Sequence, residues 1–152
     1  MQRRKFLLAG ALAMTFAVPA VHAAAAKAEP VITVYRSPTC GCCLNWVDHL
    51  RKEGFTVKVV ENEDMNNIKL EQGVPPNMTS CHTGVVNGYF LEGHVPAREV
   101  RRLLAERPTA RGISVPGMPM GSPGMEMGSH TQPYDVMLVA KDGTAKVFAQ
   151  YK

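Results

Sequence analysis

The chain has 152 residues, with 17 Lys and Arg against 13 Asp and Glu, a formal net charge of +4, and four cysteines. Three of the basic residues lie in the first 23 positions, which hold no acidic residue, so the rest of the chain carries 14 basic against 13 acidic side chains, a charge of +1. A nearly neutral chain without a stripe of Lys and Arg gives no electrostatic basis for binding nucleic acid. Its remaining length fits one domain, which we expect over residues 31–152.

The first 23 residues have the pattern of a secretory signal. Basic residues precede an apolar run from Phe6 to Val18, and a small-residue cleavage site follows at Ala23. The apolar run is shorter than the roughly 20 residues that a membrane span needs. The Arg3-Arg4 pair leaves a twin-arginine export route open beside the general secretory one. We expect residues 1–23, or a few more, to be removed, leaving a periplasmic chain without a membrane segment.

The mature chain begins with alternating strands and helices. Residues 31–36, VITVYR, are β-branched and aromatic and predict a buried strand. Residues 43–54 carry apolar side chains at helical spacing, Leu44 among them, and end in Gly. A second strand is predicted over 55–61, and 64–73 predicts a short helix that begins with an Asp. Parallel strands joined by a helix indicate an α/β domain.

A hairpin and a third helix follow. Asn87-Gly88, between the β-rich runs 83–86 and 89–92, is the strongest short hairpin signal in the chain. Residues 97–107 have an amphipathic helical pattern that stops before Pro108. The order βαβαββα is that of a thioredoxin-like domain. In that fold a cysteine turn opens the first helix, and the loop that enters the hairpin packs against the turn.

Two segments are additions to this minimal arrangement. Residues 114–133 are rich in Met, Gly and Pro and have no helical or strand period. Residues 134–151 predict a second hairpin around Lys141-Asp142-Gly143. We expect the hairpin to extend the sheet and to anchor the end of the loop, so that the loop can fold back over the cysteines.

The cysteines carry the chemistry. The stretch SPTCGCCLNW places Cys40, Cys42 and Cys43 within four positions at the start of the first predicted helix. Free backbone N–H groups and the helix dipole favour a thiolate there, most of all at Cys40. Cys40 and Cys43 have the spacing to close a disulfide, which leaves Cys42 free. A thioredoxin-like fold brings Cys81 to this turn, and the four sulfurs then form either a pair of disulfides or a soft-metal site.

Ligand softness favours copper for such a site. Thiolates and thioethers select Cu(I), and a shared thiolate can bridge two ions, so more than one copper fits. Beyond the cysteines, His82 adjoins Cys81 and His94 follows the hairpin. The long loop adds further candidate ligands, although its methionines can instead fill a groove over the domain; these candidates are Met118, Met120, Met125, Met127 and His130. We expect Trp46 to pack in the core and His49 to lie on a solvated helix face.

Five stretches carry a family resemblance. The motifs SPTCGCC, GVPPNMTSCHT, NGYFLEGHVP, GMPMGSPGME and YDVMLV resemble those of the CopG-like periplasmic copper-handling proteins, and the similarity runs from about Ile32 to the C-terminus. The resemblance implies copper tolerance, a copper-binding cysteine cluster and interconversion of copper oxidation states.

Two functions of different classes follow, with a purely structural disulfide protein as a third alternative. The first is a periplasmic Cu(I)-binding protein in copper resistance, which exchanges copper with other periplasmic carriers or exporters. The second is a thiol–disulfide oxidoreductase in which Cys40 attacks and Cys43 resolves. The additional cysteine and the methionine-rich loop favour the first, because an oxidoreductase needs only two cysteines.

Overall fold

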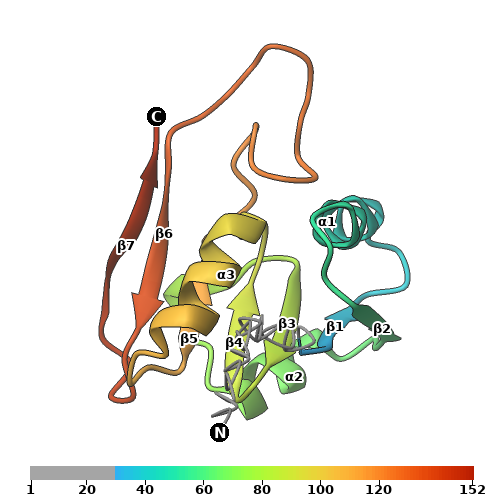
Figure 1. The fold of residues 1–152 in the computed structure, drawn as a ribbon. Helices are drawn as coiled ribbons and strands as arrows, with labels where there is room; N and C mark the ends of the chain where they lie inside the picture. The colour runs from blue at the N-terminus through green and yellow to red at the C-terminus, as the bar shows by residue number, and fades with distance from the viewer. Residues whose placement is uncertain (1–29) are drawn as a thin grey trace, which may run out of the picture.

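Residues 30–152, the part of the chain that the computed structural model describes, build a seven-stranded sheet in the order β2-β1-β3-β4-β5-β6-β7 (Figure 1). The predicted signal at 1–23 lies outside these residues. The strands are β1 (Ile32–Arg36), β2 (Val57–Glu61), β3 (His82–Val86), β4 (Tyr89–Glu92), β5 (Gly112–Ser114), β6 (Tyr134–Val139) and β7 (Ala145–Tyr151). The helices are α1 (Gly41–Lys52), α2 (Met65–Gln72) and α3 (Ala97–Glu106), with a 3-10 turn, η1, at Pro76–Met78.

The predicted α/β class is confirmed, and the elements from β1 to α3 follow the predicted order. β1 pairs in parallel with β2 and antiparallel with β3, and β3 pairs with β4 as the predicted hairpin. At its turn, Asn87 and Gly88 have φ of 49° and 80°, the left-handed conformation that this two-residue connection requires. Asp64 caps α2 by accepting a hydrogen bond from the backbone N–H of Asn67 at 3.0 Å.

The sheet has a different apolar layer on each face, because successive strand residues point to opposite sides. Leu91 of β4 belongs to the main core, which also takes in Trp46 of α1 and Leu103 of α3. Its neighbour Phe90 packs on the other face in a smaller cluster with Val139. The helices α1 and α3 therefore cover one face together, and the cysteine-bearing end of α1 lies at the rim of the main core.

The C-terminal hairpin extends the sheet as predicted, but it does so through a strand that the sequence pattern did not reveal. β5 has only three residues, all buried, and it pairs in parallel with β4 and antiparallel with β6. Period-2 patterning cannot be recognised over so short a segment. The chain between β5 and β6, residues 115–133, is called the strap below; it arches from the sheet towards α1 (Figure 1).

One of the apolar residues at helical spacing in α1, Leu44, does not belong to the core. Leu44 is 40% exposed, whereas Val47 and Leu50 are fully buried. Leu44 lies three residues before Val47 but on the edge of the apolar stripe, and the buried position beside it belongs to Cys43. Among residues 30–152, no helix is long and apolar enough to cross a membrane.

Candidate metal centre

The first turn of α1 presents three cysteines within one short segment. Cys40 is the N-cap residue of α1, and no side chain caps the helix there. Arg36, the last residue of β1, holds this turn in place. Its buried guanidinium donates to the carbonyl oxygens of Ser37 at 2.6 Å, Pro38 at 3.2 Å and Cys40 at 3.2 Å. Arg36 also forms an ion pair with Glu61 of β2 at 2.8 Å. The backbone around Cys40 is therefore fixed by contacts that do not involve its sulfur.

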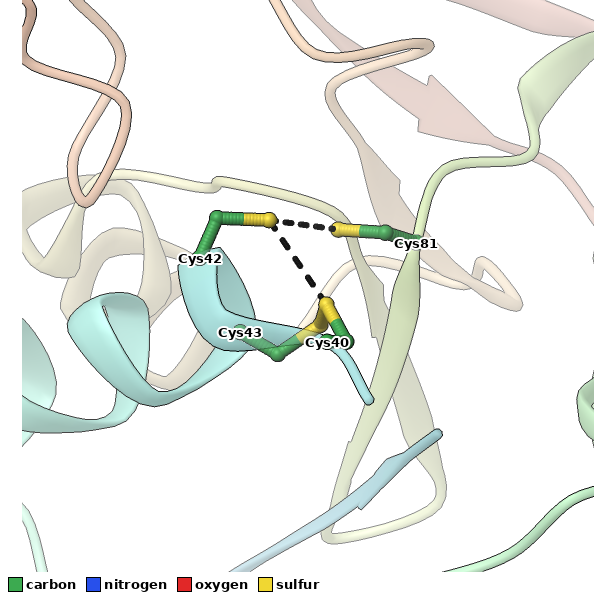
Figure 2. A group of neighbouring side chains, drawn as sticks. All are labelled: Cys40, Cys42, Cys43 and Cys81. Carbon is green, nitrogen blue, oxygen red and sulfur yellow. Dashed lines mark hydrogen bonds between the residues drawn. A yellow bond between two sulfur atoms is a disulfide. The ribbon is translucent and has the colours of Figure 1, made fainter. Parts of the chain in front are cut away.

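The four sulfur atoms converge, as the sequence predicts (Figure 2). Cys40 and Cys43 form a disulfide with a Cα–Cα distance of 5.5 Å, and Cys42 and Cys81 are free thiols. The Cys42 sulfur lies between its neighbours, 3.6 Å from the Cys40 sulfur and 3.9 Å from the Cys81 sulfur. All four sulfurs lie within 4.8 Å of one another, although Cys81 is 38 residues from the nearest of the other three.

Cys81 also belongs to a second group of candidate ligands. Its sulfur is 3.2 Å from Nδ1 of His82 and 3.3 Å from Nε2 of His94, so one thiol joins a sulfur-only set to a set with two imidazoles. The two rings meet edge to face with centroids 4.9 Å apart, and the His82 ring packs on Trp46 at 4.4 Å. Both predicted histidines thus lie beside the cysteines.

Burial sets the protonation of these groups. It holds the pKa of His82 well below its ordinary value of 6.5, with help from His94 and Lys69, and it also lowers the pKa of His94. Both imidazoles are therefore neutral at pH 7. Burial, together with the neighbouring Cys42, raises the pKa of Cys81 to about 12, so this thiol is protonated at pH 7.

A buried ionic network fixes the segment that carries Cys81. The carboxylate of Glu92 is fully buried at the end of β4. It accepts hydrogen bonds from Lys69 of α2 at 2.5 Å, from the Thr83 hydroxyl at 2.6 Å and from the backbone N–H of Ser80 at 2.7 Å. Because Ser80 precedes Cys81, its hydrogen bond to Glu92 fixes the position of the Cys81 backbone. The network lies on the face of the sheet that α2 covers. Sequence analysis missed Glu92 and Lys69; an acidic residue within a strand-like run was the only available signal.

Two residues of α1 hold the segment that carries His94. Trp46 packs in the core as predicted, and its indole also donates to the carbonyl oxygen of Val95 at 2.8 Å. The prediction that His49 is solvated was wrong: its Nε2 accepts a hydrogen bond from the backbone N–H of Ala97 at 3.1 Å. This N–H belongs to the first residue of α3, where helices have unpaired donors. The position of α3 in space supplies that contact, and the spacing of residues along α1 cannot reveal it.

The strap returns to the cysteine-bearing elements, as expected. The backbone N–H of Gly117 donates to Thr79 at 3.0 Å, and the Ser80 hydroxyl donates to the carbonyl of Gly117. Its candidate ligands differ in exposure: Met118 and Met127 are 51% and 62% exposed, Met120 and Met125 are half-buried, and His130 is exposed. Within residues 30–152, the groups of converging cysteine, histidine and carboxylate ligands do not include His130.

This arrangement has two chemical capacities. In the disulfide-bonded form the free donors are two thiols and two imidazoles, and reduction of Cys40–Cys43 adds two more sulfurs. Sulfur and imidazole donors suit copper and zinc, and a set dominated by thiolates favours Cu(I). The disulfide at a helix N-terminus is, in addition, a redox couple. The fold and the site define an α/β protein with a sulfur-rich cluster that can hold metal.

Comparison with known proteins agrees with this class. Two solved structures titled "Copper resistance protein copG", Form 2 and Form 1, are 46% and 47% identical to this chain, with TM-scores of 0.79 and 0.77. The alignments cover 82% and 81% of this chain and 99% and 98% of theirs. A family described as "Protein of unknown function, DUF411" matches residues 78–125, which include Cys81 and His94. No curated protein sequence matches.

At this identity and coverage, the chain belongs to the CopG family of copper resistance proteins.

Proposed function

We propose that this protein is a periplasmic copper-binding protein that holds Cu(I), more than one ion at a time, through Cys40, Cys42, Cys43 and Cys81. The observation that carries the proposal is the convergence of Cys81 on the cysteine turn, which gathers four sulfurs within 4.8 Å. Thiolates prefer Cu(I), and shared sulfurs allow bridging between ions. The titles of the related structures, which name copper resistance, support the same metal.

His82 and His94 complete the ligand set in this proposal. Their neutral rings face the Cys81 sulfur at 3.2 and 3.3 Å, so a copper ion at Cys81 finds nitrogen donors beside it. The strap ligands Met118, Met120, Met125, Met127 and His130 serve as outer contacts at which copper enters or leaves. Delivery then proceeds to other periplasmic copper carriers or exporters, after the signal at residues 1–23 has directed export.

The same site supports interconversion of copper oxidation states. Two Cu(II) ions accept one electron each from the thiols of Cys40 and Cys43, which gives two Cu(I), two released protons and the disulfide. The disulfide between these residues is one end state of that reaction. A further part of the proposal is that β1 to α3 form a thioredoxin-like domain, supported by the strand order β2-β1-β3-β4 and by the placement of the cysteine turn at the start of α1.

Anaerobic titration of the fully reduced chain with Cu(I), in the presence of a chromophoric competitor, tests the binding proposal. We expect more than one tightly bound Cu(I), and a lower count in Cys42→Ser and in Cys81→Ser. Thr39→Ser is the matched control, because Thr39 adjoins the turn and is exposed. Copper binding by Cys81→Ser that equals that of the unmodified chain would contradict the four-sulfur site.

The alternative function, thiol–disulfide exchange, is favoured by one specific observation. Cys43 is fully buried whereas Cys40 is partly exposed, which is the asymmetry expected of a resolving and an attacking cysteine. Exchange with glutathione in a Cys42→Ser/Cys81→Ser double variant distinguishes the two functions. Rapid exchange together with weak Cu(I) binding in the unmodified chain would favour the oxidoreductase.

A further inference from the structure

The strap contacts His94 and α1 through a turn at Pro123 and Gly124. The carbonyl oxygen of Pro123 lies 2.8 Å from Nδ1 of His94. The next carbonyl, that of Gly124, accepts a hydrogen bond from the Asn45 side chain of α1 at 3.5 Å, and the Gly124 N–H donates to Glu126 at 2.8 Å. The turn is therefore wedged between the helix that carries the cysteine turn and the ring of His94.

Only glycine fits at the centre of this turn. Gly124 has φ of +85°, and a Cβ atom there would lie 2.7 Å from the backbone nitrogen of Trp46 and 3.0 Å from the carbonyl carbon of Asn45. Both are main-chain atoms inside α1 and cannot move aside as the end of a side chain can. Any side chain at position 124 must push the strap away from α1, and the Pro123 carbonyl moves with it.

The Pro123 carbonyl determines which nitrogen of His94 carries the proton. A carbonyl oxygen can only accept, so Nδ1 of His94 donates to it and holds the hydrogen. The neutral ring then presents its lone pair at Nε2, which is the atom 3.3 Å from the Cys81 sulfur. Without this acceptor the ring can exist as the other tautomer, which presents an N–H to the sulfur and cannot bind a metal ion through Nε2.

We propose that the Pro123-Gly124 turn is a positioning element that fixes His94 as the Nδ1–H tautomer, with Nε2 directed to a copper ion at Cys81. The proposal rests on the copper-binding function proposed above and goes beyond it by assigning a role to the strap backbone. The strap thereby contributes to copper binding through a main-chain carbonyl, in addition to any role of its methionine side chains. Gly124 acts through His94 and is a positioning residue, not a ligand.

The first test uses the metal-free protein at neutral pH. Long-range ¹⁵N–¹H NMR correlations of the His94 ring distinguish the two tautomers. We expect the Nδ1–H form in the unmodified chain and a loss of this form in Gly124→Ala. An Nε2–H tautomer in the unmodified chain would overturn the proposal, and so would an unchanged tautomer in Gly124→Ala.

Gly128→Ala is the matched control. Gly128 lies in the same strap with φ of +65°, so alanine suffers a similar backbone penalty there, but a Cβ at this position meets nothing within 4 Å. We expect Gly128→Ala to keep the Nδ1–H tautomer. Equal effects of the two substitutions would show that a loosened strap, and not the Pro123 carbonyl, is responsible, and would overturn the proposal.

The second test measures Cu(I) affinity. Loss of the group that orients a ligating histidine commonly lowers metal affinity about 10-fold to 100-fold, and we expect that range for Gly124→Ala. In a His94→Ala background the same substitution should have no further effect, because both changes act through one ring. An additive loss would overturn the proposal. If the unmodified chain binds no Cu(I), the proposed function fails, while the tautomer measurement still decides whether the turn positions His94.

Discussion

The two halves of the cysteine cluster are built in opposite ways. The turn with Cys40, Cys42 and Cys43 is held by Arg36, which donates to carbonyl oxygens one, two and four residues further along the chain. The segment with Cys81 is held by contacts from α2, from the end of β4 and from the strap, which are separate segments of the chain. The first half is local and the second depends on the whole fold. Changes far from the site should therefore displace Cys81 and its histidines while they leave the cysteine turn intact.

The largest expected effect is that of removing the charge that pairs with Glu92. Lys69→Met leaves a fully buried carboxylate without its cation, and breaking such a pair costs about 3–5 kcal/mol. Urea unfolding with the disulfide intact measures the loss. Lys58→Met, at an exposed lysine of β2, is the control and should change the free energy of unfolding by less than about 0.5 kcal/mol. A loss no larger than that of the control would show that the Lys69–Glu92 pair does not stabilise the fold.

The second largest effect should be a loss of stability in acid, caused by His82 and His94. The unfolded chain binds protons as the pH falls through about 6.5, whereas folded His82 and His94, with lowered pKa values, stay neutral to lower pH. Their contribution to the free energy of unfolding is complete above about pH 6.5. It is lost as the pH drops below about 6.5, by up to about 1.4 kcal/mol per pH unit for each histidine. Urea unfolding of the metal-free protein between about pH 7 and pH 5 should show this slope, and His82→Phe should reduce it. A flat profile would contradict the burial argument.

A smaller loss of stability is expected when the hydrogen bond from Trp46 of α1 to Val95, next to His94, is removed. Trp46→Phe keeps an aromatic ring in the core but leaves the carbonyl oxygen of Val95 without its donor, a penalty of about 1–3 kcal/mol. Thermal or urea unfolding measures it. The cysteine turn serves as the control in the same variant. Since this turn is held by local contacts, the equilibrium between the Cys40–Cys43 disulfide and glutathione should stay within a few-fold of that of the unmodified chain. A large shift in that equilibrium would show that the turn is not independent.

The smallest effect should come from a local contact remote from the sulfurs. Asp64→Ala removes the cap of α2 and should cost about 1 kcal/mol, whereas Asp64→Ser retains an acceptor and should cost a few tenths. Unfolding curves of the two variants give the difference. Cu(I) binding should be the same in both, and a change in copper count would contradict the separation between the helix cap and the site.

The parts of the fold that could be predicted from the sequence are those with local causes. Asn87-Gly88 predicts its hairpin because the turn itself requires those residues, and Asp64 predicts the start of α2 because it caps the helix. The convergence of Cys81 on the turn was predicted only through the expected topology. β5 was missed because three buried residues have no measurable period and gain their place from strands on both sides.

The supporting residues of the site were missed for a related reason. His49 was assigned to a solvated face by its charged neighbours, although a contact from α3 makes it an acceptor. Glu92 and Lys69 are separated by 23 residues, and each is ordinary in its own segment. Only the packing of α2 against the sheet makes them a pair. Sequence patterns thus reveal the sulfur donors, while the groups that orient them follow from tertiary structure.

The pairing of β5 with β6 has a consequence for engineering. Ser114 and Met137 are partners in neighbouring antiparallel strands, so the 19 residues of the strap form an insertion whose two ends are held together by the sheet. Doubling the length of such an insertion adds only about 0.6 kcal/mol of chain entropy cost. Strap residues outside the contacts made by Gly117, Pro123 and Gly124 can therefore be changed in number and in donor atoms, whereas those three contacts must be kept for Cys81 and His94 to stay in place.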